Sequence, residues 1–160
     1  MLKIRSGIGY DIHRLKKGKG LYIGGIKVSD DLEFIAHSDG DVLIHALSDS
    51  LLGAIGESDI GELFPDTDPR FKGKESRYFL EAVMDIYKKR NIEIMNIDSV
   101  IIAELPKISP FKSEIRKNIS SILGVETDRF NIKSKTKEKV DAVGSGDAIE
   151  CYCVSMIRIS

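Results

Sequence analysis

Residues 41–56, DVLIHALSDSLLGAIG, have the pattern of a buried helix that carries one polar stripe. Asp41, His45 and Asp49 stand four residues apart, so they share one side of such a helix, opposite the leucines. Gly56 is a residue on which helices commonly end. The pattern predicts a helix over residues 41–55. Its apolar residues recur at helical spacing and are Val42, Leu43, Ala46, Leu47, Leu51 and Ala54.

The segment GIGYDIH, residues 7–13, alternates isoleucine and tyrosine with small or polar residues. Side chains alternate between the two faces of a strand, so Asp11 and His13 point toward the same face. The alternation therefore predicts a strand with one apolar face and one functional face.

The rest of the chain predicts further elements in a simple order. Residues 21–23 and 26–28, on either side of Gly24 and Gly25, predict a short hairpin or a bulged strand. A helix over 75–89 is followed by a strand over 92–105. Ser109 and Pro110 open a third helix as N-cap and first-turn proline, and Gly124 closes it. Strands over 130–136 and 149–159 flank a mobile loop, residues 137–147. We expect one α+β domain over residues 1–160, with its helices packed on one face of a mixed or antiparallel sheet.

Composition narrows the class of protein. The 160 residues carry 24 basic and 25 acidic side chains, a formal charge of −1. This balance supplies no broad positive field, which argues against nucleic acid and anionic membranes as partners. The apolar runs are shorter than the roughly 20 residues of a membrane-spanning helix. We expect a cytoplasmic protein of bacterial type or, if the chain is a trimmed one, a protein of a plastid-type organelle.

Cys151 and Cys153 have the pattern of ordinary apolar strand residues.

The three histidines of the chain, His13, His37 and His45, all fall between residues 13 and 45. Two imidazoles and one carboxylate suit Zn²⁺ at roughly 2.0–2.2 Å and leave a fourth position open for substrate. His13 and His45, with one carboxylate beside them, are candidates for such a catalytic site. The residues alone leave an alternative open, in which both histidines are partly buried and satisfied by neighbouring carboxylates.

Two further segments suggest a phosphorylated ligand. Gly40 precedes a helix start, where free backbone N–H groups attract an anion, although residues 37–40 also suit a simple capped turn. Residues 59–69 combine carboxylates with turn formers, which suits recognition of hydroxyl groups and equally a solvated acidic loop.

Three segments resemble the signatures of the 2-C-methyl-D-erythritol 2,4-cyclodiphosphate synthase family: GYDIH at 9–13, AHSDGDVLIH at 36–45 and DIGELFPDTDP at 59–69. The resemblance extends over nearly the whole chain. It implies a homotrimer with active sites between neighbouring subunits and a nucleotide-linked substrate, 4-diphosphocytidyl-2-C-methyl-D-erythritol 2-phosphate. The 2-phosphate of that substrate would attack its β-phosphate and release CMP, in the non-mevalonate isoprenoid pathway. Such a reaction needs positioning and charge neutralisation and no covalent nucleophile.

The resemblance also assigns residues. Asp11, His13 and His45 match zinc ligands, and Glu138 matches a ligand of a second divalent ion, Mg²⁺ or Mn²⁺. Catalytic roles fall to His37, Asp49, Asp68, Thr136 and Glu138. The residues matched to substrate contacts are Asp11, His13, His37, Ser38, Asp59, Ile60, Gly61, Phe64, Asp66, Asp68, Ala103, Pro106, Lys107, Ser134, Lys135 and Thr136. Of these, the cytidine pocket takes Ala103, Pro106, Lys107, Ser134 and Thr136.

The loop after residue 134 departs from the family's commonest pattern. Lys135 stands where Thr is frequent, and it would either contact phosphate or share a solvated face with neighbouring lysines. Asp141, Ala142 and Ser145 replace Gly, Phe and Arg. Family trimers often hold an isoprenoid diphosphate on the threefold axis through that Arg, so with Ser145 we expect this ligand to bind weakly or not at all.

Two other functions are compatible with the same three ligands. A metal-dependent phosphohydrolase would use them to activate water, and a structural module would close the zinc site. Both fit less well, because the first often uses two metals and more histidines, and the second wants a fourth protein ligand.

Overall fold

The two longest strands, β1 (Lys3–Lys17) and β7 (Ala148–Ile159), pair antiparallel along most of their length. The computed structural model describes residues 3–65, 67–71 and 73–159. The sheet has the order β4-β1-β7-β5-β6, with β4 (Leu32–Ile35), β5 (Ile92–Ile102) and β6 (Phe130–Lys135). Only the β5–β6 pair among these is parallel. The sheet is therefore mixed.

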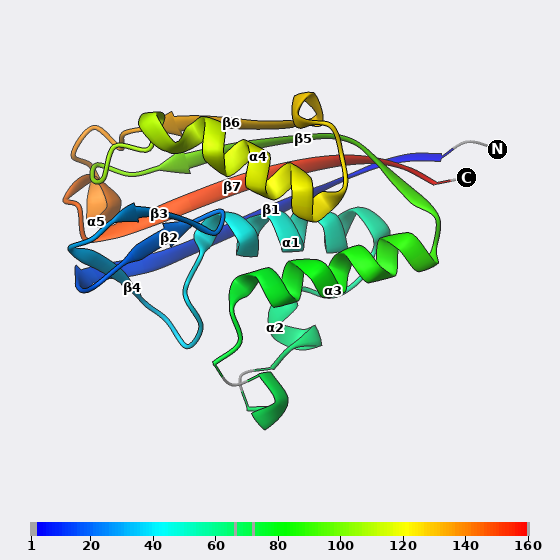
Figure 1. Cartoon of the computed structure of the whole chain (residues 1–160), viewed down its shortest axis with the longest axis horizontal. Helices are drawn as coiled ribbons and strands as arrows, with labels where there is room; N and C mark the ends of the chain where they lie inside the picture. The colour runs from blue at the N-terminus through cyan, green and yellow to red at the C-terminus, as the bar shows by residue number, and fades with distance from the viewer. Residues whose placement is uncertain (1–2, 66, 72, 160) are drawn as a thin grey trace.

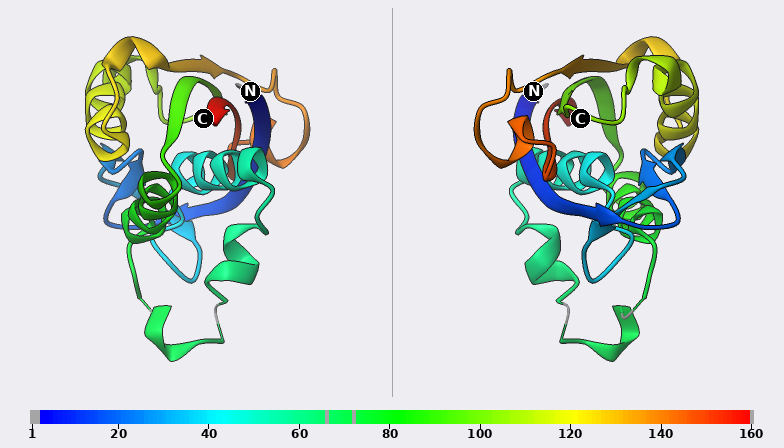
Figure 2. Two further views of the ribbon diagram at one scale, coloured as in Figure 1. Left: turned by 90° about the vertical axis from the view of Figure 1, so that its right-hand side faces the viewer. Right: turned by 90° about the vertical axis from the view of Figure 1, so that its left-hand side faces the viewer.

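Three long helices, α1 (Val42–Ile55), α3 (Ser76–Lys89) and α4 (Lys112–Leu123), lie on the same side of this sheet, which curves around α1 (Figure 1, Figure 2). Leu43 and Leu47 of α1 share one buried core with Ile149 and Cys151 of β7. The expected α+β fold, with helices on one face of a mixed sheet, is confirmed.

Helix α1 has the expected ends but a different environment. Asp41 caps its start, and Gly56, at φ 77°, ends it in the left-handed conformation. The sequence pattern predicted leucines opposite a polar stripe, yet Asp41 and His45 are themselves buried. The reason is that the sheet covers one side of α1 while α3 and the hairpin cover the other, so almost no side of the helix meets solvent.

The hairpin of β2 (Leu21–Ile23) and β3 (Ile26–Ser29) forms where it was predicted, as a separate two-stranded sheet. Gly24 and Gly25 have φ values of 59° and 73°, which a tight hairpin turn requires and glycine adopts without strain. Their N–H groups donate to the two carboxylate oxygens of Asp41, at 2.9 and 2.8 Å. Asp41, the first residue of the expected polar stripe, thus links the hairpin to the start of α1.

Several boundaries differ from the sequence prediction. The helix predicted to open at Ser109 begins instead with a 3₁₀ turn, η2 (Ser109–Phe111), so Ser109 does not cap α4. Strand β5 ends at Ile102, short of residue 105, and β6 ends before Thr136. The loop expected over 137–147 contains a short helix, α5 (Asp141–Gly144). The acidic segment contains α2 (Ile60–Leu63) and the 3₁₀ turn η1 (Pro69–Phe71), and η3 (Thr127–Arg129) precedes β6.

The apolar face of β1 points away from the helices. Ile8, Tyr10 and Ile12 are all exposed on the outer face of the sheet, and so are Tyr152 and Val154 on the adjoining strand β7. The functional face, with Asp11 and His13, is the one turned toward α1. Among the helices of the described residues, none combines the length and the apolar character needed to cross a bilayer.

Candidate metal centre and substrate cavity

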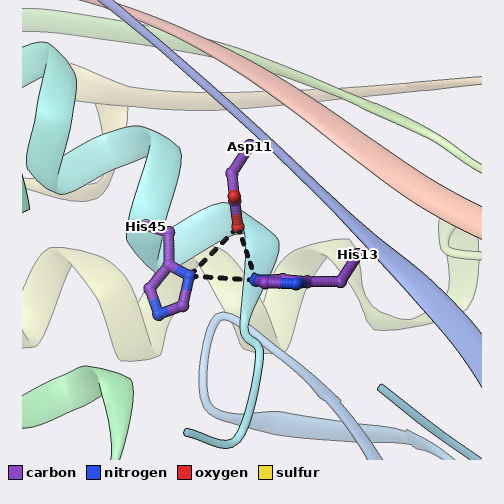
Figure 3. Close-up of side chains that lie close together, drawn as sticks. All are labelled: Asp11, His13 and His45. Atoms are coloured by element: carbon purple, nitrogen blue, oxygen red, sulfur yellow. Dashed lines mark hydrogen bonds and ion pairs between the residues drawn. The ribbon is translucent and has the colours of Figure 1, made fainter. Parts of the chain in front are cut away.

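Asp11, His13 and His45 meet where β1 passes the first turns of α1 (Figure 3). Asp11 Oδ2 lies 3.0 Å from His45 Nδ1 and 3.1 Å from His13 Nε2, and the two ring nitrogens are 3.4 Å apart. Tetrahedral zinc with bonds of about 2.1 Å separates its ligand atoms by about 3.4 Å. The three atoms therefore form a triangle that fits a metal ion, and the set of one carboxylate and two imidazoles suits zinc.

The charges at this triangle favour a cation. Burial alone would raise the pKa of Asp11, but hydrogen bonds from His13 and His45 outweigh it and lower the pKa to about 2. Burial alone would lower the pKa of His45, but its hydrogen bond to Asp11 and the charge of that carboxylate raise it above the ordinary value. A carboxylate this acidic stays ionised at neutral pH, so the site holds a fixed negative charge between two imidazoles.

A cavity of about 690 Å³ opens beside the triangle. It brings together His13 and His45 with predicted substrate residues from two distant segments. Aromatic side chains of the α2–α3 region, Phe71 and Phe79, form another part of its wall. The predicted residues in its lining are His13, His37, Ser38, His45, Ile60, Gly61 and Phe64.

Asp49 and Asp59 fix the position of α2, which forms part of the cavity wall. The backbone N–H of Ile60 donates to Asp49 Oδ1 (2.9 Å), and that of Glu62 donates to Asp59 Oδ1 (2.9 Å), so the two carboxylates fix the start of α2. Burial raises the pKa of Asp49.

Asp68 directly precedes η1 and pairs with Arg70 of that turn at 2.6 Å. This pairing keeps Asp68 occupied within its own loop. The green segment that contains η1 projects from the lower end of the molecule (Figure 2). The prediction for Asp66 falls outside the described residues.

The start of α1 is capped by the side chain of Asp41. Besides the two glycine N–H groups of the hairpin, Asp41 Oδ1 accepts the N–H of Ile44 at 3.1 Å. The carboxylate of Asp41 thus accepts one N–H group of the helix start, and its other two donors belong to the hairpin. Burial raises its pKa to about 6, against the backbone hydrogen bonds that favour the ionised form.

The predicted cytidine residues form a second group at the ends of β5 and β6. The N–H of Ala103 donates to the carbonyl of Lys135 (3.0 Å), and the hydroxyls of Ser109 and Ser134 are 3.4 Å apart. Pro106 and the exposed Lys107 lie in the turn between Ala103 and Ser109. None of these residues is in the lining of the 690 Å³ cavity, so one chain does not join the two groups.

Thr136 and Glu138 belong to this second group and lie on an unusual backbone. The Thr136 hydroxyl donates to the Glu138 carboxylate. Glu138, Lys139 and Asp141 all have positive φ, at 52°, 64° and 59°, a region that side-chain-bearing residues rarely adopt. Such strain is concentrated at functional sites, which draws attention to this loop. Ser145 ends α5 and its hydroxyl lies 2.7 Å from Asp147 Oδ2, while Lys135 is exposed on β6.

Sequence reasoning missed three residues that support these groups. Glu104 Oε1 accepts the N–H of Lys137 (2.9 Å) and so holds the Glu138 loop. Ser76 and Asp39 form a hydrogen-bonded chain behind His45. Asp39 lies inside a quoted motif, but Ser76 has no sequence signal beyond that of an ordinary serine at a helix start.

A second cavity of about 700 Å³ lies between the ends of α3 and α4 and the start of β5. Tyr87, Glu93 and Arg129 contribute to its wall, and Arg129 is paired with Glu93 at 2.9 Å. No predicted site residue is in its lining.

Comparison with known proteins agrees with the resemblance found in the motifs. The YgbB family matches residues 4–158. The chain is 44% identical to a chloroplastic 2-C-methyl-D-erythritol 2,4-cyclodiphosphate synthase of Oryza sativa, covering 98% of this chain and 70% of the relative. It is 41% identical to the synthase of Aquifex aeolicus, covering 98% of each.

Solved structures give the same result. The IspF of Plasmodium falciparum in complex with CDP is 39% identical with a TM-score of 0.87, over 98% of this chain and 97% of that one. The bifunctional IspDF of Campylobacter jejuni has a TM-score of 0.91 at 34% identity, with all of this chain covering 43% of that protein.

Proposed function

Because the chain belongs to the YgbB family, that of the 2-C-methyl-D-erythritol 2,4-cyclodiphosphate synthases, we propose that it converts 4-diphosphocytidyl-2-C-methyl-D-erythritol 2-phosphate into the 2,4-cyclodiphosphate and CMP. This membership makes the chain an enzyme of isoprenoid biosynthesis. The observation that carries the reaction is the triangle of Asp11, His13 and His45, whose two histidines line a cavity together with other residues of the family's motifs. The enzyme would act in a bacterial cytoplasm or in a plastid, the compartment named for the rice relative.

The triangle is the proposed zinc site. Its ligand atoms stand 3.0–3.4 Å apart, a spacing that suits tetrahedral coordination with one position left for substrate. A zinc ion bound there would supply Lewis acidity and a template for phosphate oxygens. Glu138 would hold a second divalent ion, Mg²⁺ or Mn²⁺.

Ring closure needs no nucleophile from the protein. An oxygen of the 2-phosphate forms a bond to the β-phosphorus, the bond from that phosphorus to the CMP oxygen breaks, and CMP leaves with the electron pair. The chain's residues have to hold both phosphates in line and keep water out. His37 and Ser38 lie in the cavity wall beside the triangle and would orient the methylerythritol end. The apolar side of the cavity, which includes Ile60 and Phe64, would exclude the water that competes with ring closure.

A complete active site would form between subunits of a homotrimer. Two observations support this: the cytidine group and Glu138 lie outside the cavity of their own chain, and the outer face of β1 and β7 exposes large apolar side chains such as Ile8 and Val154. We propose that the Glu138 loop of one subunit faces the zinc site of its neighbour. Catalytic roles for His37, Asp49, Asp68, Thr136 and Glu138 are part of this proposal. Two solved relatives in complex with CDP support a cytidine pocket, which we propose at Ala103, Pro106, Lys107, Ser134 and Thr136.

The products decide between ring closure and the rival phosphohydrolase. The purified protein, supplied with zinc and Mg²⁺, should release CMP in step with a cyclic diphosphate seen by phosphorus NMR. His45→Ala should keep its fold and lose both products, because its helix retains its leucines while the site loses a ligand. CMP accompanied by a linear product would identify a hydrolase, and no turnover of any kind would favour a binding module.

Mixing inactive subunits tests the shared site. His45→Ala and Glu138→Ala are each expected to be inactive, yet a mixed trimer contains some interfaces that join an intact His45 to an intact Glu138. Activity should therefore return after the two variants exchange subunits. Verified mixed trimers without activity would rule out the shared site.

A further inference from the structure

The second ring nitrogen of His45 has a buried partner. His45 Nδ1 faces Asp11 and His13, and Nε2 points away from them (Figure 3). Nε2 lies 2.8 Å from the hydroxyl oxygen of Ser76. Ser76 is the first residue of α3 and is fully buried. The Ser38 hydroxyl is 3.5 Å from the same nitrogen, at the limit of a hydrogen bond.

Asp39, at the end of this chain of hydrogen bonds, determines which group donates in each of them. Ser76 donates its hydroxyl proton to the carboxylate of Asp39, because an ionised carboxylate only accepts. The same carboxylate accepts the backbone N–H of Ser76 at 3.1 Å, which fixes the serine relative to Asp39. With its proton used, the Ser76 oxygen accepts, so His45 must donate from Nε2. A metal ion that displaces the Nδ1 proton, which is shared with Asp11 in the metal-free protein, would then meet the lone pair of a neutral ring.

We infer that Asp39 and Ser76 are positioning residues for the metal centre. They hold His45 in the tautomer and ring orientation that direct the Nδ1 lone pair at the triangle with Asp11 Oδ2 and His13 Nε2. Metal-bound histidines generally donate their other N–H to a fixed acceptor, and loss of that acceptor lowers metal affinity about 10- to 100-fold. The inference rests on the metal site of the proposed function and adds the residues that prepare it.

The order Asp11, His45, Ser76 is also that of a nucleophilic triad, but the geometry does not support nucleophilic catalysis. Ser76 has no exposed surface for a substrate to approach, and its proton is directed at Asp39 and not at His45. A nucleophilic serine would give its proton to the imidazole. Ser76 therefore acts through His45.

The test compares buried serines on either side of the metal ligand. Ser76→Ala should weaken Zn²⁺ binding about 10- to 100-fold and alter the visible spectrum of the Co²⁺-loaded protein. Ser48→Ala is the matched control, because Ser48 is equally buried on α1 but donates to the carbonyl of Ile44 (2.8 Å). The Zn²⁺ affinity of this variant should equal that of the wild type. Ser76→Thr keeps the hydroxyl and should restore the affinity.

Asp39→Asn provides a second variant if Ser76→Ala does not fold, since Asp39 is an exposed residue. Its amide has one acceptor oxygen where the carboxylate has two, so the hydroxyl and the N–H of Ser76 no longer have an acceptor atom each, and Zn²⁺ binding should weaken here too. In the zinc-loaded wild type, nitrogen NMR should show His45 protonated on Nε2. Wild-type affinity and Co²⁺ spectra in both variants would overturn the inference and leave the proposed function standing. A wild-type protein that binds neither ion would instead remove the zinc site of the proposed function.

Discussion

Asp11 is the central residue of the candidate metal site, because one of its oxygens lies 3.0 Å from His45 and 3.1 Å from His13. Only 22% of its side chain is exposed, and this burial would by itself favour the neutral acid. The two imidazoles reverse that preference and lower the pKa to about 2. The metal-free protein therefore keeps a carboxylate ready, and its stability depends on that ionisation.

The first prediction concerns acid unfolding of the metal-free protein. A carboxyl whose folded pKa is about 2, against an ordinary 3.8, stabilises the fold above about pH 4, and this contribution disappears as the pH falls through 2. It amounts to roughly 2 kcal/mol. The free energy of unfolding of wild type minus that of Asp11→Asn should therefore shrink from pH 5 to pH 3, measured by denaturant titration with a chelator present. The comparison stays at or below pH 5, where unfolded histidines are protonated. If the difference in unfolding free energy between the two proteins does not change with pH, the lowered pKa of Asp11 is contradicted.

Site residues were predictable where their spacing is local. Period two places Asp11 and His13 on one face of a strand, and the start of the next helix carries His45. Ser76 and Asp39 could not be found in this way, because their contact with each other depends on how α3 packs beside α1. The resemblance supplied Glu138, whereas the strained backbone around it became visible only in the structure.

At the scale of elements, β1 and α1 are in backbone contact. A Cβ added to Gly9 would lie 1.9 Å from the carbonyl oxygen of Ala46, and one added to Gly7 would lie 2.0 Å from that of Ser50. Two glycines thus allow the strand to lie directly on the helix. This close approach is what brings Asp11 and His13, on the same face of the strand, within reach of His45.

Gly9→Ala should therefore destabilise the protein by about 3 kcal/mol or more, because backbone atoms cannot move aside cheaply. Gly53→Ala is the matched control on the same interface, since its Cβ would lie 3.8 Å from the Ile8 carbonyl, an ordinary contact. Gly53 is inside α1, so alanine there should stabilise by about 0.5–1 kcal/mol. Denaturant unfolding of the two variants measures both changes. Equal stabilities would show that the strand and helix separate easily.

The long periodic elements were predicted well, and the short ones were not. Helices α1 and α3 have clear periods, whereas α2, α5 and β4 each have four residues, too few for a period to be recognised. The β2–β3 hairpin is equally short and was found from its paired glycines, Gly24 and Gly25. The start of α4 was misplaced because a serine and a proline suit a 3₁₀ turn as well as an α-helix.

For the whole molecule, the outer face of the sheet is the feature that one chain leaves unexplained. Ile8 of β1 is 68% exposed and stands opposite Val154 of β7, which is 46% exposed. Alternation along β1 predicted an apolar face but not that it would point away from the helices, because period two does not say which face meets the core. Trimer formation came only from the resemblance, and it would cover these side chains.

Val154→Asp should therefore break the assembly. Its charge would fall beside Ile8 in the apolar face, where a neighbouring subunit would have to bury it unpaired. The proposed zinc triangle lies within one chain, so the separated monomers should still bind Zn²⁺, while turnover should be lost with the proposed shared site. Tyr22→Asp is the control, because Tyr22 is 42% exposed on β2, outside the five-stranded sheet, and should leave a trimer with normal activity. Light scattering gives the subunit number and CMP release gives the activity. If the Val154→Asp protein remained a fully active trimer, the outer face of β1 and β7 would not be the subunit interface, and the shared site would need another surface.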